Sequence, residues 1–288
     1  IRICLVGSEM CIRDRSGRGF LLQSRSIGWC WIGCRTWFCL LVVTSRQWSH
    51  FLLNRGIWQG SFDTLNRDLE LRRRQPSQLT LAGDDSVVDL ELLFWPDDPE
   101  GQRQGDPVKR IAQSFHQVDP ELGFFSSGSF SRGSLFISSW SRPYAEFGFL
   151  WRDRRHRLVL LWDGSGRFDH PVLIREHRAG VDADEAPPLT AEQLLGDWCG
   201  QQTVLERDQS ADDPLITPHE LQITSEMLQG LCWLPDGGAF RVPDHLSAGR
   251  GFEIEAWWRP DPQRLERIER CYDESGSWMS NRHILLQR

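Results

Sequence analysis

One spaced motif occurs twice in this 288-residue chain, and it constrains the fold more than any other feature. Each copy reads Gly-x-Trp-x-Gly, followed by Leu, Arg and Asp at identical spacing. The copies are Gly56, Trp58, Gly60, Leu65, Arg67 and Asp68, then Gly196, Trp198, Gly200, Leu205, Arg207 and Asp208. The ends also match, because an Arg lies 12 positions after a turn glycine in both (166 to 178, and 276 to 288). A repeat at both start and finish indicates two copies of one structural unit.

The apolar spacing changes at each Trp. Before it, Trp48, Phe51 and Leu52 recur at helical spacing and predict a short helix over 46–54, while 190–195 predicts a second. After it, alternation with period two and frequent turn residues predict short strands, with one turn at Gln75-Pro-Ser77. Because the strands do not alternate with helices, we expect antiparallel meanders, and closure into barrels would remove the exposed edges.

The predicted fold is therefore all-β, with two tandem antiparallel β-barrels that are each preceded by a short helix. The expected boundaries are 46–178 for the N-terminal barrel, 179–189 for a polar, Pro-containing linker, and 190–288 for a smaller C-terminal barrel. The aromatic content, 14 Trp and 15 Phe, can fill two compact cores.

Residues 1–45 differ from the rest. The string Val6–Arg15 resembles translated sequencing-adaptor read-through, so we interpret 1–45 as non-native or disordered and expect the true start near Ser45. One alternative is a signal or membrane anchor, but the apolar run 29–43 is shorter than the roughly 20 residues of a spanning helix. The other alternative is a metal site, for which a fourth ligand is missing, formed by Cys30, Cys34 and Cys39.

Charge and cysteine content exclude several classes of protein. The net charge of −7 leaves no basic footprint for nucleic acid. Beyond residue 45 only three scattered cysteines remain, so we expect no disulfide framework and a reducing compartment, either cytoplasm or one like the plastid stroma. No catalytic motif and no converging His set is present, so we expect no metal and no integral membrane segment, and an enzyme is the less favoured class, although the absence of a motif does not exclude one.

An antiparallel barrel that opens on Gly-x-Trp and ends on an Arg resembles the lipocalins and the wider calycin superfamily. The resemblance implies that the Trp packs across the bottom of the barrel with the Arg on its indole face, a cation–π contact of roughly 0.5–2 kcal/mol. It implies barrel-closing roles for Gly56, Trp58, Gly60, Gly196, Trp198 and Gly200. The implied arginine partners are Arg175 or Arg178 for the first Trp, and Arg288 for the second.

A closer resemblance is to the uncharacterised calycin-like family of cyanobacteria and plastids called domain of unknown function 3598. It rests on four separated segments, 47–62, 128–134, 145–149 and 173–180, and implies a fold but no activity. More distantly, Phe51 to Trp58 is similar to the opening of S-type phycobilin lyases. Those lyases continue with Ser and Arg where this chain has Gly60 and Phe62.

One strand carries the candidate ligand-binding residues. Alternate side chains of a strand share a face, so an inward Glu paired with an inward Arg would form a polar anchor among aromatic side chains. The alternative is a solvent-facing strand with a surface ion pair. The candidates are Arg142, Tyr144, Glu146, Phe149 and Trp151. The Ser-rich stretch 126–139 suits barrel curvature or, alternatively, a ligand rim.

Three functions follow from these expectations. The first is non-enzymatic binding of an apolar or amphipathic small molecule, such as a tetrapyrrole, carotenoid or fatty acyl group, in the N-terminal barrel. The second is a protein-interaction or assembly factor with filled barrels. The third is a bilin lyase-like chaperone or transferase. An open interior with polar anchors favours the first, whereas barrels plugged by their own Trp and Phe favour the second.

Overall fold

The protein is almost entirely β-structure, as the sequence predicts. The computed structural model describes residues 45–119, 121–138, 142–181, 184–207, 213–247 and 249–288. The interpretation of residues 1–45 as adaptor-derived concerns a segment of which residues 1–44 lie outside the described part of the chain. In the described residues the chain forms two antiparallel sheets and two short helices, and residues 44–288 make one compact unit. None of these helices has the length and apolar character needed to cross a membrane.

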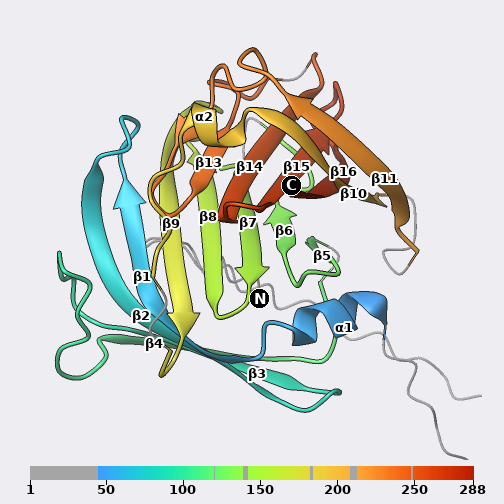
Figure 1. The fold of residues 1–288 in the computed structure, drawn as a ribbon. Coiled ribbons are helices and arrows are strands. Elements are labelled where there is room, and N and C mark those ends of the chain that lie inside the picture. Colours follow the sequence, from blue (N-terminus) through green and yellow to red (C-terminus); the bar gives the residue numbers. More distant parts are fainter. Residues whose placement is uncertain (1–44, 120, 139–141, 182–183, 208–212, 248) are drawn as a thin grey trace, which may run out of the picture. The chain divides into compact units, whose positions relative to one another are not determined.

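The first sheet has nine strands in the order β4-β3-β2-β1-β9-β8-β7-β6-β5 and is strongly curled (Figure 1). It follows helix α1 (Arg46–Leu52). Its strands are β1 (Gly56–Leu65), β2 (Leu71–Gly83), β3 (Val88–Phe94), β4 (Lys109–Phe115), β5 (Leu122–Phe124), β6 (Phe130–Gly133), β7 (Tyr144–Trp151), β8 (Arg154–Trp162) and β9 (Phe168–Arg178).

The second sheet has seven strands in the order β11-β10-β16-β15-β14-β13-β12 and follows helix α2 (Ala191–Leu194). Its strands are β10 (Gly196–Glu206), β11 (Leu215–Ile223), β12 (Cys232–Trp233), β13 (Gly238–Arg241), β14 (Phe252–Asp261), β15 (Arg264–Tyr272) and β16 (Trp278–Gln287). In both sheets the strand that opens the unit pairs with the strand that ends it, β1 with β9 and β10 with β16.

Helix α1 bridges the two ends of the first sheet. Ser45 caps this helix by accepting from the Trp48 backbone N–H at 3.1 Å. The ring of Phe51 contacts that of Phe115 in β4 and that of Phe124 in β5, with centroids 5.6 and 5.3 Å apart. Because no described ladder joins β4 to β5, the expected closure is made by this helix instead of by strand pairing.

Strand β2 runs unbroken through the Pro that was expected to mark a turn. Pro76 lies opposite Ser61 of β1, and its carbonyl accepts from the Trp95 backbone N–H at 3.0 Å. The absent N–H of Pro76 therefore falls at the end of the β3 ladder, where it costs little pairing.

The two sheets share one hydrophobic core. The side chains of Phe147 and Phe149 in β7 belong to the same buried cluster as those of Phe240 in β13 and Trp258 in β14. The opposite face of the first sheet bears Trp58 and lines its own interior. Strands β7 and β8 are consequently buried on both faces, apart from their ends.

Candidate functional site

The two Trp side chains of the repeated motif occupy equivalent, buried positions. The Trp58 indole N–H donates to the Asn54 carbonyl at 2.8 Å, and the Trp198 indole N–H donates to the Leu194 carbonyl at 2.7 Å. In both copies the acceptor lies four residues earlier, at the end of the preceding helical segment. Each ring therefore fastens its helix to the first strand of its sheet.

An Arg from the last strand of each sheet lies on the Trp ring. The guanidinium carbon of Arg178 is 4.4 Å from the centre of the Trp58 ring, and that of Arg288 is 4.0 Å from the centre of the Trp198 ring. The Arg178 guanidinium also donates to the Arg55 carbonyl at 2.9 Å. These cation–π contacts sit at the helix–strand junction, so they stabilise the start of each unit.

The other arginine considered for Trp58, Arg175, lies elsewhere. Its Nη2 contacts Asp63 Oδ2 at 2.7 Å, and its Nη1 pairs with Glu185 of the segment between the sheets. Burial would raise the pKa of the Asp63 carboxyl, but hydrogen bonds from Arg74 and Arg175 outweigh this and hold the pKa below its usual value. The structure therefore places Arg178 on the indole and uses Arg175 to hold the connecting segment.

Both copies require glycine at two positions, Gly56 and Gly60 in the first and Gly196 and Gly200 in the second. The first glycine of each copy has a positive φ, 136° and 107°, which side chains other than glycine rarely adopt. At the second, a Cβ would overlap the carbonyl oxygen of Arg175 or of Leu285 in the neighbouring strand. The motif therefore allows a close approach between the backbones of the first and last strands of each sheet, which a residue with a Cβ would prevent.

The interior of the first sheet contains the predicted anchor Glu146, paired with an arginine. Glu146 Oε1 accepts from Arg157 Nη1 at 3.2 Å, and both side chains are buried. Arg157 Nε also donates to Glu176 Oε2 at 3.2 Å. The carboxylate is thus neutralised by the protein's own side chain.

The structure does not gather the other candidate ligand-binding residues around Glu146. Phe149 faces the second sheet, where its ring centre is 6.0 Å from that of Trp258. Trp151 lies at the end of β7, where the guanidinium carbon of Arg264 is 4.0 Å from its ring centre. Tyr144 is half-buried and Arg142 is exposed.

The ion pair inside the first sheet has a counterpart inside the second. Arg157 lies opposite Ile174, and Arg267 lies opposite Ile284, so the two arginines hold the same position in their units. Arg267 Nε donates to Glu255 Oε2 at 2.7 Å, and Arg157 Nη1 donates to Glu146, which holds the equivalent position in the first copy. An inward Arg–Glu pair is therefore part of the repeated unit.

A second ion pair exists only in the first copy. Arg155 lies opposite Glu176 and donates to its Oε2 at 2.8 Å, whereas the equivalent pair in the second copy is Leu265 and Leu286. Burial lowers the pKa of Arg155 to about 10. Burial would raise the pKa of Glu176, but Arg155 and Arg157 outweigh it and hold that pKa low.

Among the described residues, three buried polar atoms of this network have no hydrogen-bond partner: Glu176 Oε1, Arg157 Nη2 and Arg155 Nη2, although the last lies 2.8 Å from Glu176 Oε2 as an ion pair. Buried polar groups are normally satisfied, so a network with a free acceptor and a free donor suits a small molecule or a water that offers both. The equivalent leucines show that the fold itself does not require the Arg155–Glu176 pair at this position.

Sequence reasoning missed a polar network between the sheets. Glu266 is fully buried and accepts from Arg264, from Ser129 of the first sheet, and pairs with His283 at 2.9 Å. Arg270, also fully buried, donates to Ser131 Oγ at 3.3 Å. The signal was the run Arg264-Leu-Glu-Arg-Ile-Glu-Arg270, which puts charges on both faces of one strand.

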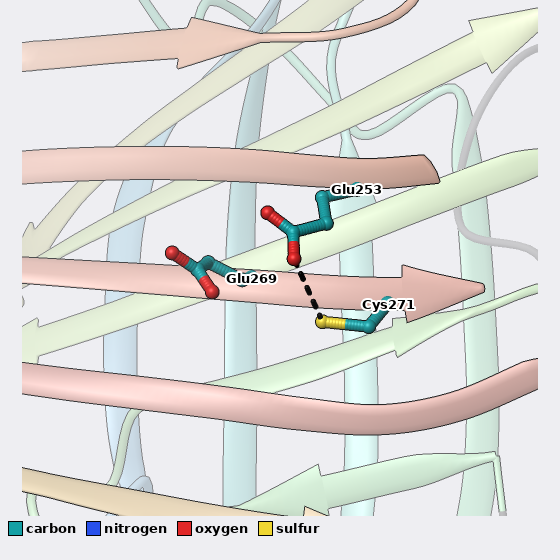
Figure 2. A group of neighbouring side chains, drawn as sticks. All are labelled: Glu253, Glu269 and Cys271. Atoms are coloured by element: carbon teal, nitrogen blue, oxygen red, sulfur yellow. Dashed lines mark hydrogen bonds between the residues drawn. The ribbon is translucent and has the colours of Figure 1, made fainter. Parts of the chain in front are cut away.

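The second sheet also holds a small group of metal-type ligands, the exposed Glu253 and the buried Glu269 and Cys271, whose ligand atoms lie within 4.8 Å of one another (Figure 2). Burial raises the pKa of the Cys271 thiol to about 11 and raises that of the Glu269 carboxyl. Arg282 Nη1 contacts Glu253 Oε1 at 3.1 Å and Glu269 Oε2 at 3.3 Å. A guanidinium between the carboxylates supplies the positive charge that a metal ion would bring.

Two copies of a Trp-based antiparallel unit with a shared core define a class of tandem, all-β proteins whose inward charges pair with each other. Residues 44–181 match the family model described as domain of unknown function DUF3598, N-terminal. Residues 228–288 match the model described as the C-terminal domain of biogenesis factor required for ATP synthase 1.

A solved structure is similar over most of the chain. It is a protein with unknown function from the DUF3598 family of Nostoc punctiforme PCC 73102, with 28% sequence identity and a TM-score of 0.70. The likeness covers 84% of this chain and 98% of that one. No curated protein matches the chain.

Proposed function

We propose that this protein is a non-enzymatic assembly factor that binds a protein partner, acts in a reducing compartment, and belongs over its full length to the DUF3598 group of calycin-like proteins. One observation carries the proposal. The inward ion pair of each unit, Arg157 with Glu146 and Arg267 with Glu255, compensates the charges of these four side chains, so none of the four is free to anchor a large ligand.

Aromatic packing inside the first sheet supports the same conclusion. The ring centres of Phe62 and Phe94 are 5.0 Å apart, and those of Phe124 and Phe130 are 5.3 Å apart. The space beside Gly148 is filled by the Phe130 ring. These rings come from adjacent strands or from strands separated by one other, and they fill part of the interior with the protein's own side chains, which disfavours a wide space for a tetrapyrrole or carotenoid.

The match of residues 228–288 to a domain of a biogenesis factor supports a protein as the class of partner. That domain covers β12 to β16, the strands that carry the inward Arg267–Glu255 pair and the contact with the first sheet. An assembly factor needs a specific, rigid surface more than a cavity, and a shared core between two sheets provides such rigidity.

Binding of purified ATP synthase subunits to the full chain tests the proposal. We expect at least one subunit to bind with a dissociation constant of about 1 μM or tighter, the range of specific protein partners. Native mass spectrometry of protein purified from a pigment-producing host should also give the mass of the polypeptide alone. Absence of subunit binding, together with a co-purified organic molecule, would overturn the proposal.

Small-molecule binding in the first sheet is the second candidate, and the comparison of the two copies favours it. Arg155 and Glu176 hold the positions that Leu265 and Leu286 hold in the second copy. Burial of these two charges has a desolvation cost, and the leucines show that the fold can form without them. The unpartnered Glu176 Oε1 and Arg157 Nη2 suit a small neutral group that both donates and accepts, such as an amide. A compound whose binding is abolished in the double variant Arg155→Leu with Glu176→Leu, which copies Leu265 and Leu286, would establish this candidate.

A further inference from the structure

Strand β11 is an edge of the second sheet. It pairs with β10 along Leu215–Ile223, and no strand in the described residues pairs with its other side. Figure 1 shows β11 at the margin of the sheet. Unpaired edges of this kind present a row of backbone donors and acceptors to any extended chain.

The repeat identifies β2 as the counterpart of β11. Leu79 of β2 lies opposite Trp58, as Leu221 of β11 lies opposite Trp198. The prolines of the two strands coincide as well, because Pro76 and Pro218 each lie three residues before that leucine. In the first sheet the outer edge of β2 is covered by β3, whereas among the described residues the second sheet has no strand in that place.

Side chains on β11 are left exposed where those of β2 are covered or charged. Leu79 is 2% exposed, but Leu221 is only partly buried. At the start of the strand, Leu215 and Ile216 are 54% and 51% exposed. They hold the positions of Arg73 and Arg74, which pair with acids in the first copy.

We propose that the open edge of β11 binds an extended segment of a protein partner, antiparallel, in the position that β3 takes on β2. This rests on the proposed function for the statement that the partner is a protein. The segment that fits alternates as β3 does, with apolar residues such as Leu90 and Leu92 turned inward and polar residues such as Asp89 turned outward. Main-chain hydrogen bonds supply affinity, and burial of Leu215 and Leu221 supplies specificity.

The backbone groups that would pair can be assigned from the first copy. The Pro76 carbonyl accepts from Trp95 N, so every second residue from Pro76 turns its peptide group towards β3. The same alternation from Pro218 places the N–H and carbonyl groups of Glu220 and Gln222 on the open edge. Substitution there affects the edge without breaking the ladder to β10.

A peptide with the sequence of residues 86–96 of this chain, extended by a lysine at each end for solubility, is the probe. We expect it to bind the full chain and to slow hydrogen–deuterium exchange at the amides of Glu220 and Gln222 at least tenfold. Gln222→Pro removes one outward donor and should weaken binding at least tenfold while the melting temperature stays within a few degrees. Glu220→Gln changes a side chain but no backbone donor, so its affinity should stay within twofold of the wild type.

Three results would overturn the inference. The first is unchanged hydrogen–deuterium exchange on β11 at saturating peptide. The second is equal affinity of wild type and Gln222→Pro for the peptide. The third is a dimer of this chain that dissociates on the Gln222→Pro substitution. Its failure is separable from that of the proposed function. If an ATP synthase subunit binds wild type and Gln222→Pro equally, the edge-site inference is refuted and the proposed assembly function stands. If the peptide binds but no subunit does, the assembly function is refuted and the edge site stands.

Discussion

Ser129 of the first sheet donates its hydroxyl to Glu266 of the second sheet at 2.7 Å, and neither side chain is accessible to solvent. The same carboxylate accepts from Arg264 at 2.7 Å and pairs with His283 at 2.9 Å. Each sheet therefore satisfies polar groups of the other, and the two units are joined by more than the apolar core.

Stability at low pH tests this contact. Burial would raise the pKa of Glu266, but His283 and Arg264 outweigh it and lower the pKa from 4.5 to about 2. A lowered carboxyl pKa contributes stability above the unfolded value, and that stability is lost as the pH falls from about 4.5 towards 2. We expect Glu266→Gln to be less stable than wild type at pH 7, with a difference that shrinks by pH 3.

Urea unfolding at several pH values measures that difference. Glu274→Gln is the matched control, because Glu274 is exposed, and it should track the wild type at every pH. A Glu266→Gln deficit of constant size between pH 7 and pH 3 would contradict the assignment.

His156 predicts a second pH dependence of stability at the same junction. Burial, followed by the charges of Arg175 and Arg154, lowers its pKa from 6.5 to about 3. Between these values the unfolded chain binds a proton that the folded protein does not, so this group reduces stability as the pH falls from about 6.5 to 3, by up to about 1.4 kcal/mol per unit. We expect His156→Gln to flatten that part of the stability–pH curve. The exposed His116→Gln should leave the curve unchanged, and an unaltered slope in His156→Gln would refute the prediction.

The second glycine of each motif predicts that a larger residue there destabilises the pairing of two strands. A Cβ on Gly60 or Gly200 overlaps a carbonyl oxygen of the adjacent strand, so each Ala variant should lose about 2 kcal/mol or more. Gly164 has open space at its Cβ, and Gly164→Ala should stay within about 0.5 kcal/mol of wild type. Chemical denaturation of the three variants checks this, and equal stability of all three would contradict the role of the motif.

Converting the first interior to the pattern of the second predicts a non-additive result. Glu176→Leu alone leaves Arg155 buried without its partner and should cost about 3–5 kcal/mol. The double change Arg155→Leu with Glu176→Leu copies Leu265 and Leu286 and should restore most of that loss. A double-mutant cycle by urea unfolding measures the coupling. Additive losses in the double variant would show that the ion pair is needed for the fold.

The architecture was largely predictable because the repeat is local in sequence. The helix–Gly–Trp junction depends on residues within about ten positions of each other, and the arginine that packs on it is marked by its fixed distance from a turn glycine. Alternation then predicted two antiparallel sheets, which the structure confirms. Pro76 was read as a turn because a proline's effect depends on which edge its nitrogen faces, and local sequence does not encode that.

The site was less predictable because its chemistry depends on contacts between sheets. Alternation assigns one buried face to a strand, but β7 is buried on both faces, since the second sheet covers the side that bears Phe149. Tyr144 and Glu146 do share a face, yet the partner of Glu146 comes from the next strand, Arg157. Glu266 and Ser129 are 137 residues apart, so no pattern within either unit joins them.

A high-resolution electron-density map of protein isolated from a pigment-producing host tests the central claim most directly, around the atoms Arg157 Nη2 and Glu176 Oε1. The account predicts density no larger than an ordered water, with both ion pairs intact around it. Continuous density for an organic molecule there, lying against the ring of Phe62, would contradict the claim that the protein fills its own interior and acts through its outer surface.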